Sequence, residues 1–330
     1  MNMAELRILV TGGAGFLGSS LCHSLIELGH KVVALDSLFR GTKDNLTDIM
    51  GNDNFTFLHA DVREVEALDS AVETLGGLDL VFHLAAVNGT KWFHEAAHSV
   101  IDVNINGTLR TLELAMAHDA RYVLASSPEA FGEAPEQPIR DGNMMQFTDP
   151  AKHQRHSYGA SKYLDEVACQ HAAREGLDVR IVRPFNAYGP RLVGDDYGQV
   201  VSIFFNKLLN NETIVVHGDG LQTRSFTWID DVTNGFVKAG LLDQGIDGSA
   251  LLGVAFNIGS TEEITISQLA EKVVQASGKD NSKVEFGTGY FGDSKRRLPD
   301  IEDSKKILGW QPTVDLQQGL QMMWNELTEN

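Results

Sequence analysis

The chain has 330 residues, which at roughly 150 residues per domain corresponds to about two domains or one large α/β unit. Hydrophobic residues make up 42% and charged residues 22% of the chain, with only 8 prolines, so disordered, fibrous and low-complexity classes are excluded. The 45 acidic and 27 basic side chains give a net charge of −18, which argues against sequence-independent binding to nucleic acid or to an anionic membrane.

The sequence also indicates the compartment and the state of the cysteines. No apolar run approaches the roughly 18 residues of a membrane-spanning helix, and the N-terminal segment lacks the features of a signal peptide. A cytoplasmic protein is therefore expected. Two cysteines, Cys22 and Cys169, are too few for a disulfide framework, so both are expected to be reduced and buried. No metal site is predicted.

Short apolar runs alternate with longer amphipathic segments over the first two-thirds of the chain. A helix is expected over residues 19–28, because apolar residues recur there at helical spacing and Gly29 follows as a stop signal. The continuous apolar character of the short runs is typical of parallel strands that are buried on both faces. Strands are accordingly predicted at residues 8–10, 31–35, 55–59, 80–85, 122–126, 179–182 and 254–258. This alternation predicts an α/β fold with a doubly wound parallel Rossmann sheet.

The remainder of the chain is less regular. Residues 133–157 contain three prolines and little periodicity, which predicts a long loop, and loops of that length are usually functional. From about residue 186 the alternation loosens, which predicts a smaller, irregular C-terminal lobe. Helices are expected there over residues 267–277 and about 315–327.

A glycine-rich turn closes the first predicted strand and opens the first helix. Its sequence, TGGAGFLG over residues 11–18, places glycines at Gly12, Gly15 and Gly18, with Phe16 and Leu17 between them. Such glycines allow a tight turn, a close approach of backbone to pyrophosphate, and close packing of helix on strand. Asp36, eighteen positions after Gly18, ends the second strand, where a carboxylate binds ribose hydroxyls and repels a 2′-phosphate. The pattern predicts a dinucleotide site that prefers NAD to NADP.

Other residues at the carboxyl ends of the predicted strands are candidates for the same site. Ligands of doubly wound sheets bind at that edge. The third strand ends at Asp61 and Val62 and the fourth at Leu84, Ala85 and Ala86, so these residues are expected to contact the cofactor. Asn104 is also a candidate, and its spacing leaves two interpretations open, a polar kink in a helix or a proton-relay residue.

Tyr158 and Lys162 are the strongest candidates for catalysis. Their spacing of four places the phenol and the ammonium group on one face of a predicted helix. A nearby ammonium charge lowers the pKa of a phenol, so Tyr158 is expected to accept a proton from a substrate hydroxyl while hydride leaves the same carbon.

Seven segments in order resemble the extended short-chain dehydrogenase/reductases, in the family of NAD-dependent nucleotide-sugar epimerases and dehydratases that includes UDP-glucose 4-epimerase. The resemblance covers nearly the whole chain. The matching segments are TGGAGFLG, HLAA, SSPEAFG, YGASK, RPFNAYGPR, GDGLQTRSF, and RLPD followed by KKILGWQP.

The resemblance implies roles for individual residues. Tyr158 matches the catalytic base, Lys162 its partner, and Ser127 the hydroxyl residue that assists transfer at C4 of the sugar. Pro184 matches the residue that contacts the nicotinamide amide. The positions that hold the nucleotide diphosphate and the sugar are matched by Asn186, Arg191, Arg224 and Arg297, and arginine suits phosphate because its planar fork donates several charge-assisted hydrogen bonds.

The resemblance also implies an organisation. Residues 1–185, with about 236–262, are expected to form the NAD-binding Rossmann domain. Residues of about 186–235 and 263–330 are expected to form the nucleotide-sugar-binding lobe. A homodimer is expected, with the helices around residues 100–117 and 158–173 paired across a twofold axis.

The chain departs from the family pattern near the expected catalytic residues. Phe131 replaces the usual tyrosine, and Pro128 replaces the aspartate that serves as general acid in 4,6-dehydratases, which disfavours dehydration. Glu129 remains as a candidate base. Uronic-acid decarboxylases carry Ser-Glu where this chain has Pro128 and Glu129, and an arginine at the position of Arg155, where a cation can hold a uronate carboxylate. Related 4-epimerases also carry an arginine there, so Arg155 by itself leaves both reactions open. Residues 88–94 are expected to line the sugar pocket.

These observations favour an enzyme that oxidises C4 of a nucleotide-diphosphate sugar, preferably a UDP-sugar, to a transient 4-keto intermediate and then completes a C4 epimerisation. The first alternative is decarboxylation of UDP-glucuronate. The second alternative is 4,6-dehydration of a nucleotide-diphosphate sugar. An NAD-binding sensor module without activity is disfavoured by the intact Ser127, Tyr158 and Lys162. A simple NADPH-dependent reductase is disfavoured by Asp36.

Overall fold

The computed structural model describes residues 4–194, 198–289 and 294–329. Within these residues, seven parallel strands form one sheet in the order β11-β6-β5-β4-β1-β2-β3. The strands are β1 (Arg7–Thr11), β2 (Lys31–Asp36), β3 (Phe55–His59), β4 (Leu80–His83), β5 (Arg121–Ala125), β6 (Val179–Pro184) and β11 (Ala255–Ile258). The order reverses direction between β1 and β4, and such a switch point is where doubly wound sheets bind their ligands.

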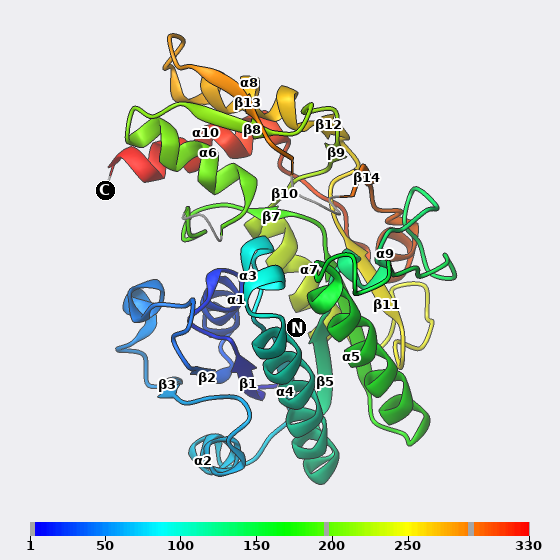
Figure 1. Ribbon diagram of the computed structural model, residues 1–330. Helices are drawn as coiled ribbons and strands as arrows, with labels where there is room; N and C mark the ends of the chain where they lie inside the picture. Colours follow the sequence, from blue (N-terminus) through cyan, green and yellow to red (C-terminus); the bar gives the residue numbers. More distant parts are fainter. Residues whose placement is uncertain (1–3, 195–197, 290–293, 330) are drawn as a thin grey trace.

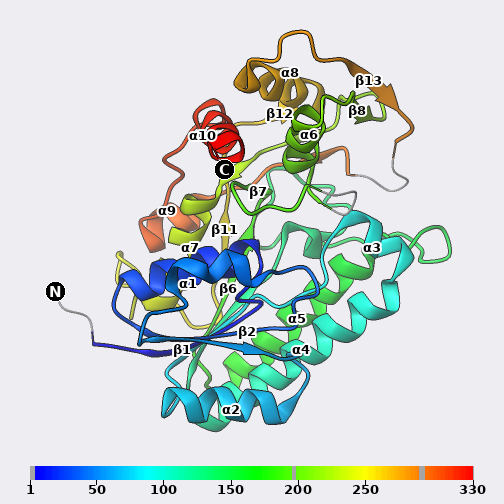
Figure 2. The same cartoon turned by 90° about the vertical axis from the view of Figure 1, so that its left-hand side faces the viewer.

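Helices cover both faces of the sheet (Figures 1 and 2). On one face lie α1 (Phe16–Glu27) and α7 (Ile229–Leu241), with α9 (Glu302–Leu308) beside α7 and β11. On the other lie α2 (Val65–Leu75), α4 (Ala97–His118) and α5 (His156–Arg174). The short α3 (Thr90–Glu95) follows β4 and precedes α4, and the 3-10 helices are η1 (Lys43–Ile49) and η2 (Pro128–Phe131).

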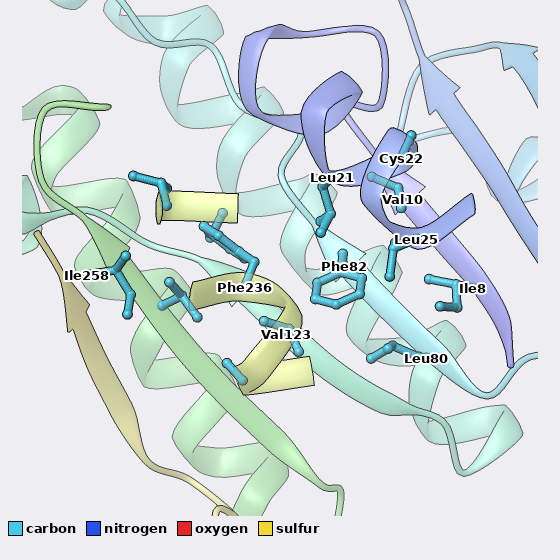
Figure 3. Packing of buried hydrophobic residues seen from close by; sticks show 14 of the residues in the cluster. Ile8, Val10, Leu21, Cys22, Leu25, Leu80, Phe82, Val123, Phe236 and Ile258 are labelled. Atoms are coloured by element: carbon cyan, nitrogen blue, oxygen red, sulfur yellow. The ribbon is translucent and has the colours of Figure 1, made fainter. Parts of the chain in front are cut away.

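The core beneath α1 and α7 is packed around Phe82 of β4 (Figure 3). Leu21 and Leu25 of α1 and Phe236 of α7 belong to this cluster. α7 approaches closely because Gly240 has no side chain: a Cβ there would lie 2.3 Å from the Phe82 ring. Burial of such side chains stabilises the fold by about 1.5–3 kcal/mol each.

A smaller lobe packs against the carboxyl edge of the sheet (Figure 2). It contains α6 (Val200–Leu209), α8 (Ile266–Ser277), α10 (Leu316–Glu329) and the parallel pair β8 (Ile214–His217) and β13 (Val284–Gly287). Short strands form two further small sheets: β7 (Ala187–Tyr188) with β10 (Thr227–Trp228), and β9 (Thr223–Arg224) with β12 (Ile264–Thr265) and β14 (Arg296–Arg297). Phe205, Leu269 and Trp324 lie in its core.

The structure confirms the predicted α/β fold and shifts the ends of several elements. α1 begins at Phe16 rather than at residue 19, because the glycine turn itself leads directly into the first helical turn. β4 ends at His83, two residues earlier than expected. Both cysteines are buried thiols. In the described part of the chain no helix is long and apolar enough to cross a membrane.

Candidate active site

A cavity of about 710 Å³ lies between the carboxyl edge of the sheet and the smaller lobe. Its volume falls within the range of roughly 300–1,000 Å³ that is usual for ligand pockets. It brings together nearly every residue that the sequence singled out, from distant parts of the chain. These residues are Gly12, Gly15, Phe16, Leu17, Gly18, Asp36, Asp61, Val62, Leu84, Ala85, Ala86, Ser127, Glu129, Arg155, Tyr158, Lys162, Pro184, Asn186, Arg191, Arg224 and Arg297.

The glycine turn forms one end of the cavity. A Cβ on Gly12 would lie 2.8 Å from the backbone nitrogen of Ala85, and a Cβ on Gly18 would lie 2.0 Å from the carbonyl oxygen of Gly12. Gly12 also has a positive φ of 68°. Gly15 faces the cavity, where the first backbone N–H groups of α1 have no partners within the helix. The turn therefore fits a dinucleotide pyrophosphate, which these N–H groups would hold.

Asp36 ends β2 at the same edge and lines the cavity. Its carboxylate accepts hydrogen bonds from the backbone N–H groups of Ala14, at 3.0 Å, and Leu38, at 2.7 Å. Burial raises its pKa, and these hydrogen bonds act against burial. The two backbone donors fix the carboxylate where a ribose would lie, in agreement with the predicted preference for NAD.

Two of the predicted cofactor residues have protein partners. The Asp61 carboxylate forms an ion pair with Arg63 at 2.6 Å, and Arg63 also contacts Asp102 of α4. Asn104 is fully buried and is absent from the cavity lining. Its Oδ1 accepts a hydrogen bond from the Val87 N–H at 2.8 Å, and its Nδ2 donates one to Ser161 Oγ at 2.9 Å. These two bonds tie the segment after β4 to α5, and the role of Asn104 as a polar kink or a proton-relay residue stays a prediction.

Tyr158 lies in the first turn of α5, and its ring stacks on Phe93 of α3 with centroids 5.0 Å apart. Burial raises the pKa of its phenol; a hydrogen bond with Ser127 acts in the opposite direction, and the charges of Glu129 and Asp165 raise it further. The expected lowering by Lys162 is outweighed here.

Lys162 has an acidic neighbour that explains this result. Its ammonium group lies 3.2 Å from the carboxylate of Asp165, and both side chains are almost completely buried. A buried carboxylate at this distance offsets much of the positive field that Lys162 would exert on the phenol. Sequence reasoning missed Asp165, although its spacing of three from Lys162 on a helix indicates a neighbour.

A 3-10 turn after β5 presents Ser127 and Glu129 to the cavity. Ser127 is the N-cap of η2, and its Oγ accepts a hydrogen bond from the Glu129 N–H at 3.2 Å. Pro128 suits the first position of the turn, because that position needs no backbone N–H. Gly159 lets α5 approach: a Cβ there would lie 2.4 Å from the carbonyl oxygen of Glu129.

Glu129 is held by two arginines from different lobes. Its Oε1 forms an ion pair with Arg297 of β14 and lies 3.5 Å from Nη2 of Arg155, and both guanidinium groups are buried. Burial acts to raise the pKa of Glu129, but the positive charges of Arg297 and Arg155 outweigh burial and lower it to about 2. Glu129 is therefore ionised at neutral pH.

The remaining predicted substrate residues line the cavity in the smaller lobe. Asn186 donates a hydrogen bond to the Ser225 carbonyl oxygen at 2.7 Å, and Arg224 lies on β9 beside Arg297 in register. Arg297 itself reaches the Gly132 carbonyl oxygen at 3.1 Å and Ser294 Oγ at 2.6 Å, so the structure places it at the Glu129 end of the cavity. Trp92 and Phe93, within the expected segment 88–94, also line the cavity.

The doubly wound sheet, the glycine turn and the Ser127–Tyr158–Lys162 group together define an NAD-dependent enzyme of the extended short-chain dehydrogenase/reductase class. The model of the NAD dependent epimerase/dehydratase family matches residues 8–259. The chain belongs to this family, whose members modify nucleotide sugars.

Individual relatives differ in their reactions. UDP-glucuronic acid decarboxylase 4 of Arabidopsis thaliana is 36% identical over 96% of this chain and 68% of its own length. UDP-N-acetyl-alpha-D-glucosaminuronate decarboxylase of Bacillus cytotoxicus is 32% identical over 98% of this chain and 99% of its own. A solved structure of UDP-glucose 4-epimerase from Thermotoga maritima with UDP-glucose superposes with a TM-score of 0.87, at 29% identity, over 98% of this chain and 99% of that chain.

Proposed function

We propose that this enzyme decarboxylates a UDP-uronic acid. The sequence favoured C4 epimerisation with decarboxylation as the alternative, and the similarity to decarboxylases over nearly the whole chain supports the alternative better. The observation that carries the proposal is the buried group of Glu129, Arg155 and Arg297 on the cavity wall that also presents Tyr158.

The buried group of Glu129, Arg155 and Arg297 contains cations that can bind the carboxylate of a uronate. Two buried guanidinium groups surround one ionised carboxylate, so cations outnumber anions within this group. Arginine donates charge-assisted hydrogen bonds to carboxylates, so this wall of the cavity suits a uronate. Arg155 is the residue that we assign to the uronate, because it lines the cavity beside Tyr158 and lies at 3.5 Å from Glu129, whereas Arg297 forms the closer ion pair with Glu129.

Tyr158, Ser127 and Lys162 have different parts in the proposed chemistry at C4. Bound NAD supplies the acceptor and later the donor of a hydride at this carbon. Tyr158 accepts the proton of the C4 hydroxyl, and Ser127 donates a hydrogen bond to the oxygen as its charge develops. Before this transfer, Lys162 stabilises the phenolate form of Tyr158 that can accept the proton, with its own charge moderated by Asp165.

Decarboxylation then needs no further cofactor. In a 4-keto uronic acid the bond between C5 and the carboxylate breaks, its electron pair moves toward the C4 carbonyl, and carbon dioxide leaves. Tyr158 and Ser127 stabilise the charge on the C4 oxygen. The carbanion at C5 takes up a proton, for which water held by the ionised Glu129 is the assigned source. Return of hydride to C4 completes a UDP-pentose, so the net change is loss of carbon dioxide and uptake of one proton.

A panel of nucleotide sugars tests this function. The purified protein is incubated with UDP-glucuronate, UDP-N-acetylglucosaminuronate, UDP-glucose, UDP-N-acetylglucosamine and dTDP-glucose, and product masses and sugar proton spectra are recorded. The proposal predicts that a uronate alone is converted, to a product lighter by carbon dioxide. A neutral sugar that changes its proton spectrum at constant mass would establish epimerisation instead.

C4 epimerisation is the second candidate. It is favoured by the superposition with the Thermotoga maritima epimerase and by the Ser127, Tyr158 and Lys162 set, which alone suffices for oxidation at C4. We assign Glu129 a part only in decarboxylation, because epimerisation requires no proton donor at C5.

We further propose a homodimer built on α4 and α5. These helices lie side by side on the outside of the molecule (Figure 1). Large apolar side chains on them are exposed, and they are Ile101, Leu109, Met116, Tyr163, Leu164 and Val167. An exposed apolar stripe that crosses α4 and α5 can pack against the same stripe of a second copy about a twofold axis.

The division of the chain into an NAD-binding domain and a nucleotide-sugar lobe, at about residues 186, 236 and 263, also stays a prediction.

A further inference from the structure

A cluster of possible metal ligands lies outside the cavity, in the long segment between η2 and α5. Glu133 follows η2, His153 lies three residues before α5, and His156 is the first residue of α5, so both histidines come twenty or more residues after Glu133. The potential ligand atoms of the three residues all lie within 4.8 Å of one another. The sequence predicts no metal site here. Glu133 is twenty residues away from the nearer histidine, which matches no known spacing of metal ligands, and only the fold brings the three residues together.

The cluster has the burial that a binding site needs. His156 is 8% exposed and Glu133 and His153 are half-buried. His156 Nε2 lies 2.9 Å from Glu133 Oε1. Among the described residues, no hydrogen-bond partner meets the buried Nδ1 of His156. Nε2 is therefore the nitrogen of His156 that is placed to share an ion with Glu133.

Neighbouring side chains hold the cluster together. The rings of His153 and His156 lie close to each other, with centroids 5.2 Å apart. Thr148 Oγ1 donates a hydrogen bond to Glu133 Oε1 at 2.6 Å, which is the kind of outer contact that orients a ligating carboxylate. The edge of Phe147 packs against His156 and closes one side.

We propose that Glu133, His153 and His156 bind one divalent transition-metal ion of the zinc type. Two imidazoles and one carboxylate are the ligands of many zinc sites, with a water molecule in the fourth position. Zinc ligands lie about 2.0–2.2 Å from the ion, which separates them by about 3.3 Å in a tetrahedron, so the His156–Glu133 pair already has nearly the required spacing. Calcium and magnesium are disfavoured because they prefer oxygen ligands.

The ion would join the two elements that carry the catalytic residues. Glu133 lies four residues after Glu129, and His156 lies two residues before Tyr158. Ligation by both therefore closes the intervening loop at its two ends, which stabilises the folded state by the binding free energy of the ion. The proposal does not depend on which nucleotide sugar the enzyme accepts.

Metal titration tests the site directly. Tag-free full-length protein is freed of metal with a chelator and titrated with Co²⁺, whose visible absorption reports tetrahedral coordination, and bound Zn²⁺ is counted by elemental analysis. We expect one ion per chain and a higher Tm with Zn²⁺. The variants His153→Ala, His156→Ala and Glu133→Gln should each lower the affinity by at least about 100-fold, and Thr148→Val by about 10-fold. His118→Ala, at the exposed end of α4, is the matched control and should bind as the wild type does.

Several results would overturn the proposal. The first is a wild-type protein that does not bind one ion tightly per chain. The second is a metal affinity that stays at the wild-type value in all three ligand variants. Should an alanine variant fail to fold by circular dichroism, the wild-type stoichiometry and the isosteric Glu133→Gln variant decide the question. The readout is metal binding, so an error in the proposed reaction leaves this test unaffected.

Discussion

Arg155 is the residue that we propose to bind the carboxylate of a uronate. Its guanidinium is buried at 5% exposure and shares Glu129 with Arg297. A charged hydrogen bond to a carboxylate contributes about 1.5–3 kcal/mol, or roughly 10-fold to 150-fold in affinity. Arg155→Gln should therefore weaken binding of UDP-glucuronate by that factor and leave binding of UDP nearly unchanged. Calorimetric titration of both ligands measures the difference, and an equal loss for both would show that Arg155 does not contact the uronate.

Glu129 makes the stability of the protein depend on pH in a defined window. Its pKa in the folded protein is about 2, below the usual 4.5, because two arginines outweigh the effect of its burial. A lowered folded-state pKa means that the carboxylate stabilises the fold fully above the unfolded-state value, and that this contribution is lost as the pH falls toward 2.

We expect the difference in the free energy of unfolding between the wild type and Glu129→Gln to become smaller as the pH falls. The free energy of unfolding should favour the wild type at pH 7, and the advantage should decline from about pH 5 downward. Urea unfolding of both proteins over a series of pH values measures it. A difference that is constant down to pH 3 would contradict the ion pairs seen around Glu129.

At the scale of elements, the contact between α5 and η2 sets the geometry of the catalytic residues. Gly159 makes this contact possible, since a Cβ there would meet the Glu129 carbonyl oxygen at 2.4 Å, and backbone cannot yield as a flexible side chain can. Gly159→Ala should displace Tyr158 from Ser127 and lower kcat by about 100-fold, because small misplacements of reacting groups are costly. Binding of NAD at the glycine turn should persist.

Gly51→Ala provides the matched control, because nothing lies within 4 Å of a Cβ at that position and its backbone is unstrained. Steady-state kinetics and NAD titration of both variants check the prediction. If Gly159→Ala kept the wild-type kcat, the packing of α5 on η2 would have no catalytic importance.

The elements also show what sequence could and could not predict. The strands of the sheet are continuous apolar runs, and the glycine turn has a unique strand-turn-helix context, so both were predictable locally. The contacts of Asn104 were not, because its spacing suits both a polar kink and a relay, and its partners Val87 and Ser161 come close to it only in the fold. The pairing of Glu129 with Arg297 joins positions far apart in sequence, and no local pattern encodes it.

At the scale of the whole molecule, the exposed apolar stripe on α4 and α5 predicts a dimer. Leu164, at 47% exposure, lies on this stripe. Leu164→Glu would place a charge in the proposed interface and should convert the dimer to a monomer in sedimentation experiments. Ile246→Glu is the control, because Ile246 is also exposed but lies outside the stripe. A Leu164→Glu protein with the wild-type mass in solution would exclude this face as the interface.

The proposed function requires that the two lobes enclose a uronate and that the enzyme removes its carboxyl carbon. UDP-glucuronate labelled with carbon-13 at C6 tests the claim most directly, with Tyr158→Phe as the variant that lacks the assigned base. We predict that the wild type releases the label as carbon dioxide and leaves an unlabelled UDP-pentose, while Tyr158→Phe loses activity by about 100-fold or more. A nucleotide sugar that is converted and still carries the label at C6 would contradict the claim.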